Sequence, residues 1–353
     1  MLKKNTFIAD YKIGDEFHDV FVIRSRREGT TKTGKPYLTI NIGDKSGELS
    51  GNIWDDVEKY RDICQVGAFV KATGKVEEYN GKPQLRLKTL HTVATEEAPL
   101  DAFVVVSPRD RAEMAAELRN CISSITKPAL KKLLNHFFGE RSESGAAFQS
   151  ATAAKTFHHA YVGGLMEHSL SMAKIADLLV NHYHGLDRDL LVAAALLHDL
   201  GKVLELADKG LGVTDYTDAG RLLGHISMTF AMVTEAAARQ KDFPPDLLLR
   251  LQHCLLSHHS RLEFGSPIVP MTVEAFLLSI IDDLDAKMNM FDRLRREKKE
   301  DGFAWSEYQR ALERYLYIEK FKPEEAVRLD DKPRGGTKAD EADSSMPQPG
   351  KLF

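Results

Sequence analysis

The apolar run Leu190–Leu197, which ends in the dipeptide His198-Asp199, constrains this chain more than any other feature of its sequence. A stretch that is almost wholly apolar is buried, and it carries the two ionisable side chains into the interior with it. A buried carboxylate without a partner costs several kcal/mol, whereas a bound metal ion turns the same group into a ligand. The dipeptide therefore predicts a metal site at the end of a buried helix.

Other polar residues stand at the edges of apolar helical stretches in the same way. They are His168, His225, His258, His259 and Asp282. Imidazole nitrogens and a carboxylate from separate helices suit a divalent first-row metal ion, and the carboxylate of Asp199 can bridge to a second ion. Neighbouring residues on a helix are rotated by about 100°, so usually only one of a pair faces inward. The residues alone leave open which histidine of the pair His258-His259 does so, and the same holds for Asp282 and Asp283.

Length and composition set broad limits on what the chain is. At 353 residues it exceeds one small core, so two domains with connectors are expected. The net charge of −4 gives no overall reason to bind nucleic acid, which then requires a local basic surface. The cysteines lack the spacing of a disulfide framework or a zinc knuckle. Because the N-terminus lacks a signal peptide and no stretch holds roughly 18 uncharged apolar residues, we expect a cytoplasmic protein without membrane contact.

Residues 10–95 show short alternating runs separated by turn residues, the pattern of β-structure. Five strands are predicted, at Val20–Ser25, Tyr37–Ile42, Glu48–Trp54, Phe69–Glu78 and Gln84–Val93. A helical stretch over residues 55–60 separates the third strand from the fourth. Five short strands in this length predict a small closed all-β barrel.

The order of these strands, with Gly-Asp-Lys-Ser-Gly-Glu before Leu-Ser-Gly-Asn-Ile-Trp at residues 43–54, resembles an OB-fold of the nucleic-acid-binding type. The resemblance implies a platform on which aromatic side chains stack on single-stranded bases and basic side chains follow the phosphates. The candidates are Tyr37, Trp54, Tyr79, Lys71, Lys82 and Arg86, with Lys35 and Lys88 as further basic residues. The alternative is that Trp54 and Tyr37 fill the barrel and the lysines form a solvated face.

Helical periodicity follows the barrel and continues to about residue 325. Residues 96–145 are expected to form a helical connector with Ser107 as its first N-cap, and residues 146–325 an all-α domain with the metal ligands. The tail, residues 326–353, has too few large apolar residues to fold and is expected to be disordered. The connector helices and a helix over residues 311–317 are candidate surfaces for a homo-oligomer.

The order of the ligand candidates, namely histidine, His-Asp, histidine, histidine pair and aspartate, resembles the HD-domain phosphohydrolase superfamily. A fuller string reads His-His-Ala-Tyr-Val-Gly-Gly-Leu-Met-Glu-His at residues 158–168 and His-Asp-Leu-Gly-Lys at residues 198–202. Together with the OB-fold, this string resembles the YhaM type of 3′-to-5′ exoribonuclease over residues 10–320. The expected fold is therefore multi-domain, an all-β OB-fold barrel followed by an all-α HD-domain helical bundle.

The resemblance implies a ligand set for two divalent ions. One ion is implied at His168, His198, Asp199 and Asp282. A second ion, bridged to the first by Asp199, is implied at His225 and at His258 or His259. Asp282 is favoured over Asp283 because it takes the place of the aspartate in the family's Asp-x-Leu-Asp-Ala run. Mn²⁺ is the first choice from the resemblance, and Fe²⁺, Co²⁺, Ni²⁺ and Zn²⁺ also suit such ligands.

Two ions about 3.5–4 Å apart can activate water and stabilise the leaving oxygen of a phosphodiester. The activity implied by the resemblance is hydrolysis of single-stranded RNA from its 3′ end. The catalytic candidates are Asp199, Lys202 and His159. Lys202 would neutralise a phosphate oxygen, and His159, with His158 and Lys155, would bind the terminal nucleotide or donate a proton. The alternative is a solvent-facing lysine and a polar loop that only borders the site.

Three other functions compete with this interpretation. Single-stranded DNA is a second possible substrate, because stacking and backbone contacts do not read the 2′-hydroxyl. HD-domain phosphohydrolases also act on small nucleotides, including cyclic dinucleotides, and such an activity would survive deletion of residues 1–100. A non-catalytic RNA-binding protein with structural metal ions is the third, although the intact ligand set argues against it.

Overall fold

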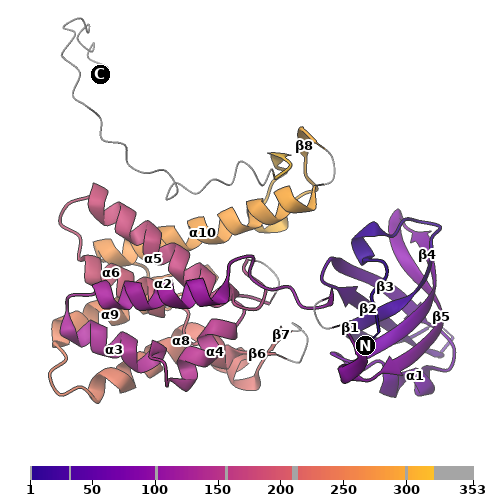
Figure 1. Cartoon of the computed structure of the whole chain (residues 1–353), viewed down its shortest axis with the longest axis horizontal. Coiled ribbons are helices and arrows are strands. Elements are labelled where there is room, and N and C mark those ends of the chain that lie inside the picture. The colour runs from indigo at the N-terminus through magenta and orange to yellow at the C-terminus, as the bar shows by residue number, and fades with distance from the viewer. Residues whose placement is uncertain are drawn as a thin grey trace, which may run out of the picture. The chain divides into compact units, whose positions relative to one another are not determined.

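The computed structural model describes residues 2–31, 33–99, 102–155, 158–208, 214–298 and 301–321. The chain divides into two units, residues 1–290 and 291–353. The first unit contains a β-barrel and a helical domain (Figure 1). The predicted disordered tail, residues 326–353, lies outside the described residues.

The barrel is closed by five strands (Figure 1). They are β1 (Glu16–Thr30), β2 (Pro36–Asp44), β3 (Gly47–Ile53), β4 (Phe69–Tyr79) and β5 (Lys82–Val93), with α1 (Val57–Ile63) between β3 and β4. Neighbouring strands follow the order β1-β2-β3-β5-β4, and β4 pairs back onto β1. All pairs are antiparallel except β3 and β5. The predicted all-β OB-fold barrel is confirmed.

Alternation along the strands separates the barrel core from its surface. In β4, for example, Val70, Ala72 and Val76 are buried, whereas Lys71, Thr73 and Lys75 point outward. Short 3₁₀ turns, η1 (Ile8–Asp10) and η2 (Thr95–Glu97), flank the barrel in sequence. The buried residues of β1, β2 and β4, Phe17 and Phe21 among them, therefore fill the interior, whereas Trp54 and Tyr79 are exposed at the surface.

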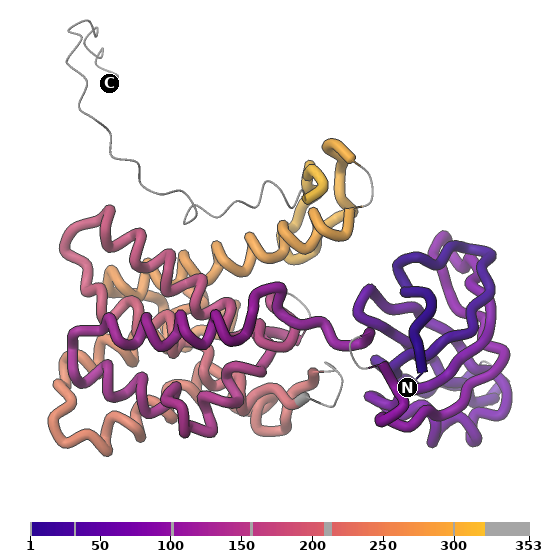
Figure 2. Tube along the Cα trace, viewed as in Figure 1, coloured from indigo at the N-terminus to yellow at the C-terminus, as the bar shows by residue number. Residues whose placement is uncertain are grey.

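The helical domain is built around one fully buried helix. Its helices are α2 (Arg111–Ser124), α3 (Pro128–Phe138), α4 (Glu143–Ser150), α5 (Gly164–His182), α6 (Arg188–Leu197), α7 (Lys202–Glu205), α8 (Asp218–Ala238), α9 (Pro245–Ser257) and α10 (Val273–Glu297). Every residue of the predicted apolar run Leu190–Leu197 in α6 is 0% exposed. Helices α3, α5 and α9 pack against α6. Helix α5 also lies beside α10, although α10 comes much later in the chain, as the colours of the tube in Figure 2 show. The predicted helical bundle is confirmed.

The helical part also contains two short hairpins that the sequence did not predict. They are β6 (Leu206–Asp208) with β7 (Thr214–Tyr216), and β8 (Phe303–Trp305) with β9 (Tyr317–Glu319). The helix expected over residues 311–317 is wrong, because that stretch is a 3₁₀ turn, η5 (Arg310–Leu312), followed by β9. The turn η4 (Leu262–Phe264) follows α9. None of the helices in the described ranges is long and apolar enough to cross a bilayer.

Ser107 does not cap the first connector helix as predicted. The N-cap of α2 is Asp110, whose carboxylate accepts hydrogen bonds from the backbone N–H groups of Ala112 at 2.8 Å and Glu113 at 2.9 Å. Ser107 instead donates its hydroxyl to Glu167 at 2.6 Å on α5. An aspartate at the N-cap satisfies the first backbone N–H groups and favours the positive helix end, so it displaces the serine three residues earlier.

Asp189 ties the turn between α2 and α3 to the start of the buried helix α6. Its carboxylate, 5% exposed, accepts three hydrogen bonds of 2.7 Å, from the backbone N–H and hydroxyl of Thr126 and from the backbone N–H of Lys127. Burial raises the pKa of Asp189, but these hydrogen bonds outweigh it and lower that pKa below its ordinary value. The ionised carboxylate therefore stabilises the fold around α6.

Replacement of Asp189 by alanine leaves these donors without their acceptor, and we expect a loss of about 2–3 kcal/mol in the free energy of unfolding. Because the folded pKa is lowered, the contribution is present above the unfolded value of about 3.9 and is lost as the pH falls through the folded value. Denaturant unfolding followed by circular dichroism at neutral and acidic pH measures both effects. Asp242→Ala, at an exposed position, is the matched control; an equal loss in both variants contradicts the prediction.

Candidate metal centre and nucleic-acid groove

The predicted ligands converge from five helices onto one buried point. His168 lies on α5, His225 on α8 and Asp282 on α10. His198 and Asp199 follow α6, and His258 and His259 follow α9. The side chains of His168, His198, Asp199 and His258 are almost completely buried. The apolar helix α6 thus carries its terminal His-Asp pair into the core, as the sequence predicted.

The turn that contains His198 and Asp199 packs closely against the backbone of α8. A Cβ atom at Gly201 would lie 2.3 Å from the backbone carbonyl oxygen of His225, so only glycine fits there. The backbone N–H of Gly201 also donates to the hydroxyl of Thr229 at 2.8 Å. Helix α8 is kinked at Gly224, where φ is 71°, and this kink sets the direction of the His225 side chain that follows.

One group of ligand candidates, the aspartate group, consists of His168, His198 and Asp282. The Nε2 atom of His168 lies 3.2 Å from Asp282 Oδ1 and 3.2 Å from the Nε2 atom of His198. Asp199 Oδ2 is 3.2 Å from the same nitrogen of His198. Two imidazole nitrogens and two carboxylate oxygens in this arrangement provide the donors that a divalent cation needs.

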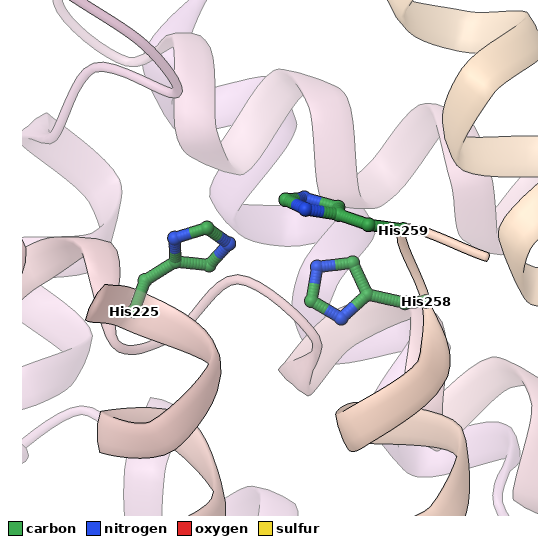
Figure 3. Close-up of side chains that lie close together, drawn as sticks. All are labelled: His225, His258 and His259. Carbon is green, nitrogen blue, oxygen red and sulfur yellow. The ribbon is translucent and has the colours of Figure 1, made fainter. Parts of the chain in front are cut away.

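A second group, the histidine group, consists of His225, His258 and His259. Figure 3 shows the three rings close together, from α8 and from the end of α9. Asp199 Oδ1 lies 3.2 Å from the Nε2 atom of His225 and 3.7 Å from that of His258. These three atoms are buried and have no hydrogen-bond partner among the described residues. Buried polar atoms without partners are costly, and a metal ion would satisfy all three at once.

Asp199 connects the two groups. Its Oδ2 atom faces the aspartate group and its Oδ1 atom faces the histidine group. A carboxylate shared in this way is the donor arrangement that a pair of adjacent ions requires. The residues present therefore fit two divalent ions.

The hydrogen bonds on the outer sides of the rings fix their orientation. His198 and His258 donate Nδ1–H to backbone carbonyls of Ala195 and Leu255 at 2.9 and 2.8 Å. His259 donates to the carbonyl of Phe264 at 2.8 Å. The two remaining rings donate to carboxylates, His168 to Asp285 at 2.7 Å and His225 to Glu205 at 3.1 Å. All five Nε2 atoms are thus left as lone-pair donors for metal ions.

Electrostatics at the aspartate group favour positive charge. Burial lowers the pKa of His168, but hydrogen bonds to Asp282 and Asp285 outweigh it and raise that pKa to about 10. Burial raises the pKa of Asp282, and the hydrogen bond of His168 and the charge of His198 together hold it far below its usual range. A cation at this point would take the place of the His168 proton. At the histidine group, burial and neighbouring histidines hold the pKa of His258 well below its usual value, which keeps the ring neutral.

The two ambiguous pairs have different arrangements. Asp282 faces the ligands, whereas the Asp283 side chain is 64% exposed and pairs with Lys287 at 2.5 Å. Both His258 and His259 belong to the histidine group, because the chain turns out of α9 between them. The rotation of about 100° that separates neighbours holds only inside a helix.

Lys202, a predicted catalytic residue, lies at the centre. Its Nζ atom is 2.6 Å from Asp199 Oδ2, and the side chain is largely buried. Burial lowers the pKa of Lys202, but the charge of Asp199 outweighs it and raises that pKa. The ammonium group is therefore charged and does not form a solvent-facing helix end. Lys155, in contrast, pairs with Asp215 at 2.8 Å at the surface.

The geometry argues against the predicted catalytic role of His159. Its Nε2 atom is hydrogen-bonded to Asp285 at 3.0 Å and its Nδ1 atom to the Tyr161 hydroxyl at 2.9 Å. With both ring nitrogens engaged inside the protein, His159 cannot reach a substrate. Its neighbour His158 is half-buried, and its ring lies 5.5 Å from that of His168.

Asp285 and Glu205 are site residues that the sequence analysis missed. Asp285 follows Asp282 by three residues on α10, so both carboxylates lie on one helix face, and this spacing was the available signal. Glu205 follows Lys202 by three residues in α7. For neither carboxylate does the sequence alone indicate which histidine it contacts.

A groove of about 820 Å³ runs along the barrel surface between β2–β3 and β4–β5. Four predicted residues, Tyr37, Trp54, Tyr79 and Arg86, line it, together with Lys88. Trp54 is 53% exposed, which excludes the alternative that its ring fills the barrel, and Tyr79 is 63% exposed. The rings of Tyr37 and Trp54 pack at 4.8 Å between centroids.

Three of the predicted basic residues, Lys35, Lys71 and Lys82, do not line this groove. Lys71 lies at the other end of β4 and Lys82 at the start of β5. The groove also contains the acidic residues Asp55, Asp56, Glu77 and Glu78. Arg86 pairs with Glu77 at 3.2 Å. The groove therefore presents exposed aromatic rings without an excess of basic residues.

Comparison with known proteins covers both domains. The family model described as "HD domain" matches residues 165–287, and the one described as "OB-fold nucleic acid binding domain" matches residues 22–93. A protein of Bacillus subtilis (strain 168), named 3′-5′ exoribonuclease YhaM, is 38% identical over 286 residues, which is 80% of this chain and 88% of that protein. The protein of the same name from Bacillus pumilus (strain SAFR-032) is 37% identical over 289 residues, 81% and 90% of the two chains.

We expect Asp282→Ala to weaken Mn²⁺ binding by more than about 100-fold, because it removes a donor that faces the aspartate group, and outer residues alone contribute 10–100-fold in metal sites. Asp283→Ala, one residue further along the same helix, is the matched control and should leave the affinity unchanged. Calorimetric titration of the metal-free protein measures both. Equal losses in the two variants contradict the assignment of Asp282.

Proposed function

Because the chain belongs to the YhaM family of 3′-5′ exoribonucleases, we propose that it removes nucleotides from the 3′ end of single-stranded RNA with the help of bound divalent metal ions. The observation that carries the proposal is the position of Asp199, a buried carboxylate whose two oxygens face two separate groups of imidazoles. The direction of degradation rests on the relatives' names alone.

We assign two ions to the centre. The ligands of one are His168, His198, Asp282 and the Oδ2 atom of Asp199. The ligands of the other are His225, His258, His259 and the Oδ1 atom of Asp199. Mn²⁺ remains the first choice, with Fe²⁺, Co²⁺, Ni²⁺ and Zn²⁺ as alternatives, because mixed imidazole and carboxylate donors suit them better than Mg²⁺.

The chain's own residues orient and neutralise the substrate around these ions. A pair of divalent ions supplies an activated water and stabilises the charge that develops on the phosphoryl group. Lys202, charged and buried beside Asp199, is placed to donate hydrogen bonds to a non-bridging phosphate oxygen. His158, whose ring packs beside His168, is placed to contact the terminal nucleotide. Burial of His198, Asp199 and Lys202 keeps bulk water from these side chains and strengthens their interactions.

The barrel groove supplies the binding surface for the single strand. Aromatic side chains stack on bases of any sequence, so Tyr37, Trp54 and Tyr79 suit a nuclease that must move along its substrate. Arg86 and Lys88 are the basic residues in the groove that can contact phosphates. Single-stranded DNA remains a further candidate substrate, because stacking does not read the 2′-hydroxyl. We also propose a cytoplasmic location, because Cys64, Cys121 and Cys254 are free thiols. Self-assembly of the chain is a further proposal.

With Mn²⁺ and a 5′-labelled single-stranded RNA, we expect a ladder of products that shortens from the 3′ end. Asp199→Ala should abolish the ladder, because it removes the carboxylate shared by both ligand groups. Asp283→Ala should keep it. A DNA of the same sequence in a parallel lane measures the sugar selectivity. Intact RNA in the presence of bound metal contradicts the proposal and directs attention to small nucleotides.

Replacement of Trp54 by alanine should weaken the binding of a single-stranded RNA by about 5-fold to 150-fold, because one base stack contributes about 1–3 kcal/mol. Fluorescence anisotropy with a labelled oligonucleotide, in a chelator that prevents hydrolysis, measures the dissociation constant. Trp305→Ala is the matched control, since Trp305 is the chain's other tryptophan, also exposed, and lies outside the groove. An unchanged affinity for Trp54→Ala rules out this groove as the binding surface.

A further inference from the structure

The two ligand groups around Asp199 offer different donor atoms. With Asp199 shared, the aspartate group provides two imidazoles and two carboxylates, and the histidine group provides three imidazoles and one carboxylate. Imidazole nitrogen suits Zn²⁺, Ni²⁺ and Fe²⁺, whereas carboxylate oxygen suits Mn²⁺. The two positions are therefore chemically unequal before any ion is chosen.

Each group also contains one histidine whose outer nitrogen contacts a buried carboxylate. In the aspartate group this is His168, bonded to Asp285, and in the histidine group it is His225, bonded to Glu205. The other three rings donate to backbone carbonyls. A carboxylate on the outer nitrogen makes the inner nitrogen a stronger donor than a carbonyl does.

We propose that the centre holds two non-equivalent ions, a late first-row ion such as Zn²⁺ at the histidine group and Mn²⁺ at the aspartate group, and that Glu205 and Asp285 are positioning residues that each act on one of them. This inference rests on the proposed function, because it requires the two-ion centre.

Asp285 sits in a network that holds His168 from behind. Besides His168, its carboxylate accepts hydrogen bonds from the ring of His159 at 3.0 Å and from the hydroxyl of Ser171. His159 is held in turn by its backbone N–H, which donates to Asn289 at 2.8 Å, and its backbone has the left-handed φ of 45°. A strained residue that is fixed on three sides is typical of a positioned site. The network fixes the proton of His168 on Nδ1.

The atoms of His159, His168 and Asp285 lie close enough together to hold an ion themselves. Their spacing argues for hydrogen bonds instead, at 2.7 and 3.0 Å, and the second nitrogen of His159 is engaged by Tyr161. An ion there would also displace the proton on Nδ1 of His168, and the two ring nitrogens of His168 would then bind two different ions. We therefore assign these three residues to a hydrogen-bond relay, and a third bound ion is an outcome that the test distinguishes.

Glu205 controls His225 in a different way. The same oxygen, Oε1, accepts the backbone N–H of His225 at 3.0 Å and its ring Nδ1–H at 3.1 Å. It therefore fixes both the chain direction after the kink at Gly224 and the rotation of the ring. One oxygen that accepts both bonds thus makes Glu205 a positioning residue for His225.

The experiment is a Zn²⁺ titration of the metal-free, full-length protein by calorimetry, with Asp285→Asn and Glu205→Gln as isosteric variants. The wild type should bind two ions in two resolved steps. Glu205→Gln should weaken the tighter step by about 10-fold to 100-fold and spare the other. Asp285→Asn should weaken only the second step by a similar factor. Asp283→Asn, an exposed carboxylate on the same helix as Asp285, should change neither.

A second readout uses electron paramagnetic resonance. After one equivalent of Zn²⁺, added Mn²⁺ should bind with the signal of a single site in the wild type and in Glu205→Asp, which retains the charge. The same signal should weaken in Asp285→Asn. Melting temperatures of the metal-free variants show whether each one is folded. If Asp285→Asn does not fold, Ser171→Ala, which removes one of its donors, should weaken only the Mn²⁺ step.

Several results would overturn the inference. Two equal Zn²⁺ sites, a single site, three sites, or variants that weaken both steps alike each contradict it. Failure of the proposed function looks different, because a protein that binds two unequal ions yet leaves RNA intact contradicts only the nuclease activity. An active nuclease with two equal ions contradicts only the non-equivalence.

Discussion

The buried carboxylate of Asp199 is the interaction on which the rest of the structure depends. Transfer of an ionised carboxylate into an apolar interior is costly unless cationic partners surround it. Here the Lys202 ammonium group lies at 2.6 Å from Asp199, and the Nε2 atoms of His198 and His225, each 3.2 Å from an Asp199 oxygen, are placed to share a metal cation with it. Since α6 is apolar and fully buried from Leu190 to Leu197, the pair at its end has no access to solvent, and the surrounding helices have to provide the compensation.

This requirement explains why the helices that contain ligands converge. Helices α5, α8 and α10, and the turn after α9, each place a polar side chain at the point where they face Asp199 or its neighbours. In α10, Asp282, Asp285 and Asn289 follow one face at helical spacing, while Asp283 and Lys287 lie on the exposed side. The packing of these helices against one another therefore brings the ligands of the centre together.

Much of this arrangement could be predicted from the sequence, because periodicity and ligand type are local properties. The burial of residues 190–197, the five strands and the grouping of the predicted ligands all follow from such patterns. The roles of His159 and Asp285 could not be predicted, because they depend on contacts between residues 126 positions apart. The inclusion of His259 depends on where α9 ends, and helix ends are the least certain feature of a sequence pattern.

The barrel shows a related limit. Lys71 and Tyr79 lie on the same face of β4, so alternation alone places both on the binding surface. They are eight residues apart, which corresponds to about 26 Å along a strand, and the groove covers only the end that contains Tyr79. The direction of a side chain is a local property, whereas the extent of a groove is set by the strands and loops on either side.

The hydrogen bonds behind the imidazole rings have a consequence for assembly of the protein. His198 and His258 donate to carbonyls three residues earlier, at the ends of their own helices, so their orientation arises as soon as α6 and α9 form. His168 and His225 are oriented only by Asp285 and Glu205, which other helices supply. Two of the five imidazole rings are thus oriented by their own helices, and the full ligand set requires the helices that supply Asp285 and Glu205 to dock. An ion that binds only then selects the completed domain over its partly folded forms and adds its binding free energy to the stability of the native state.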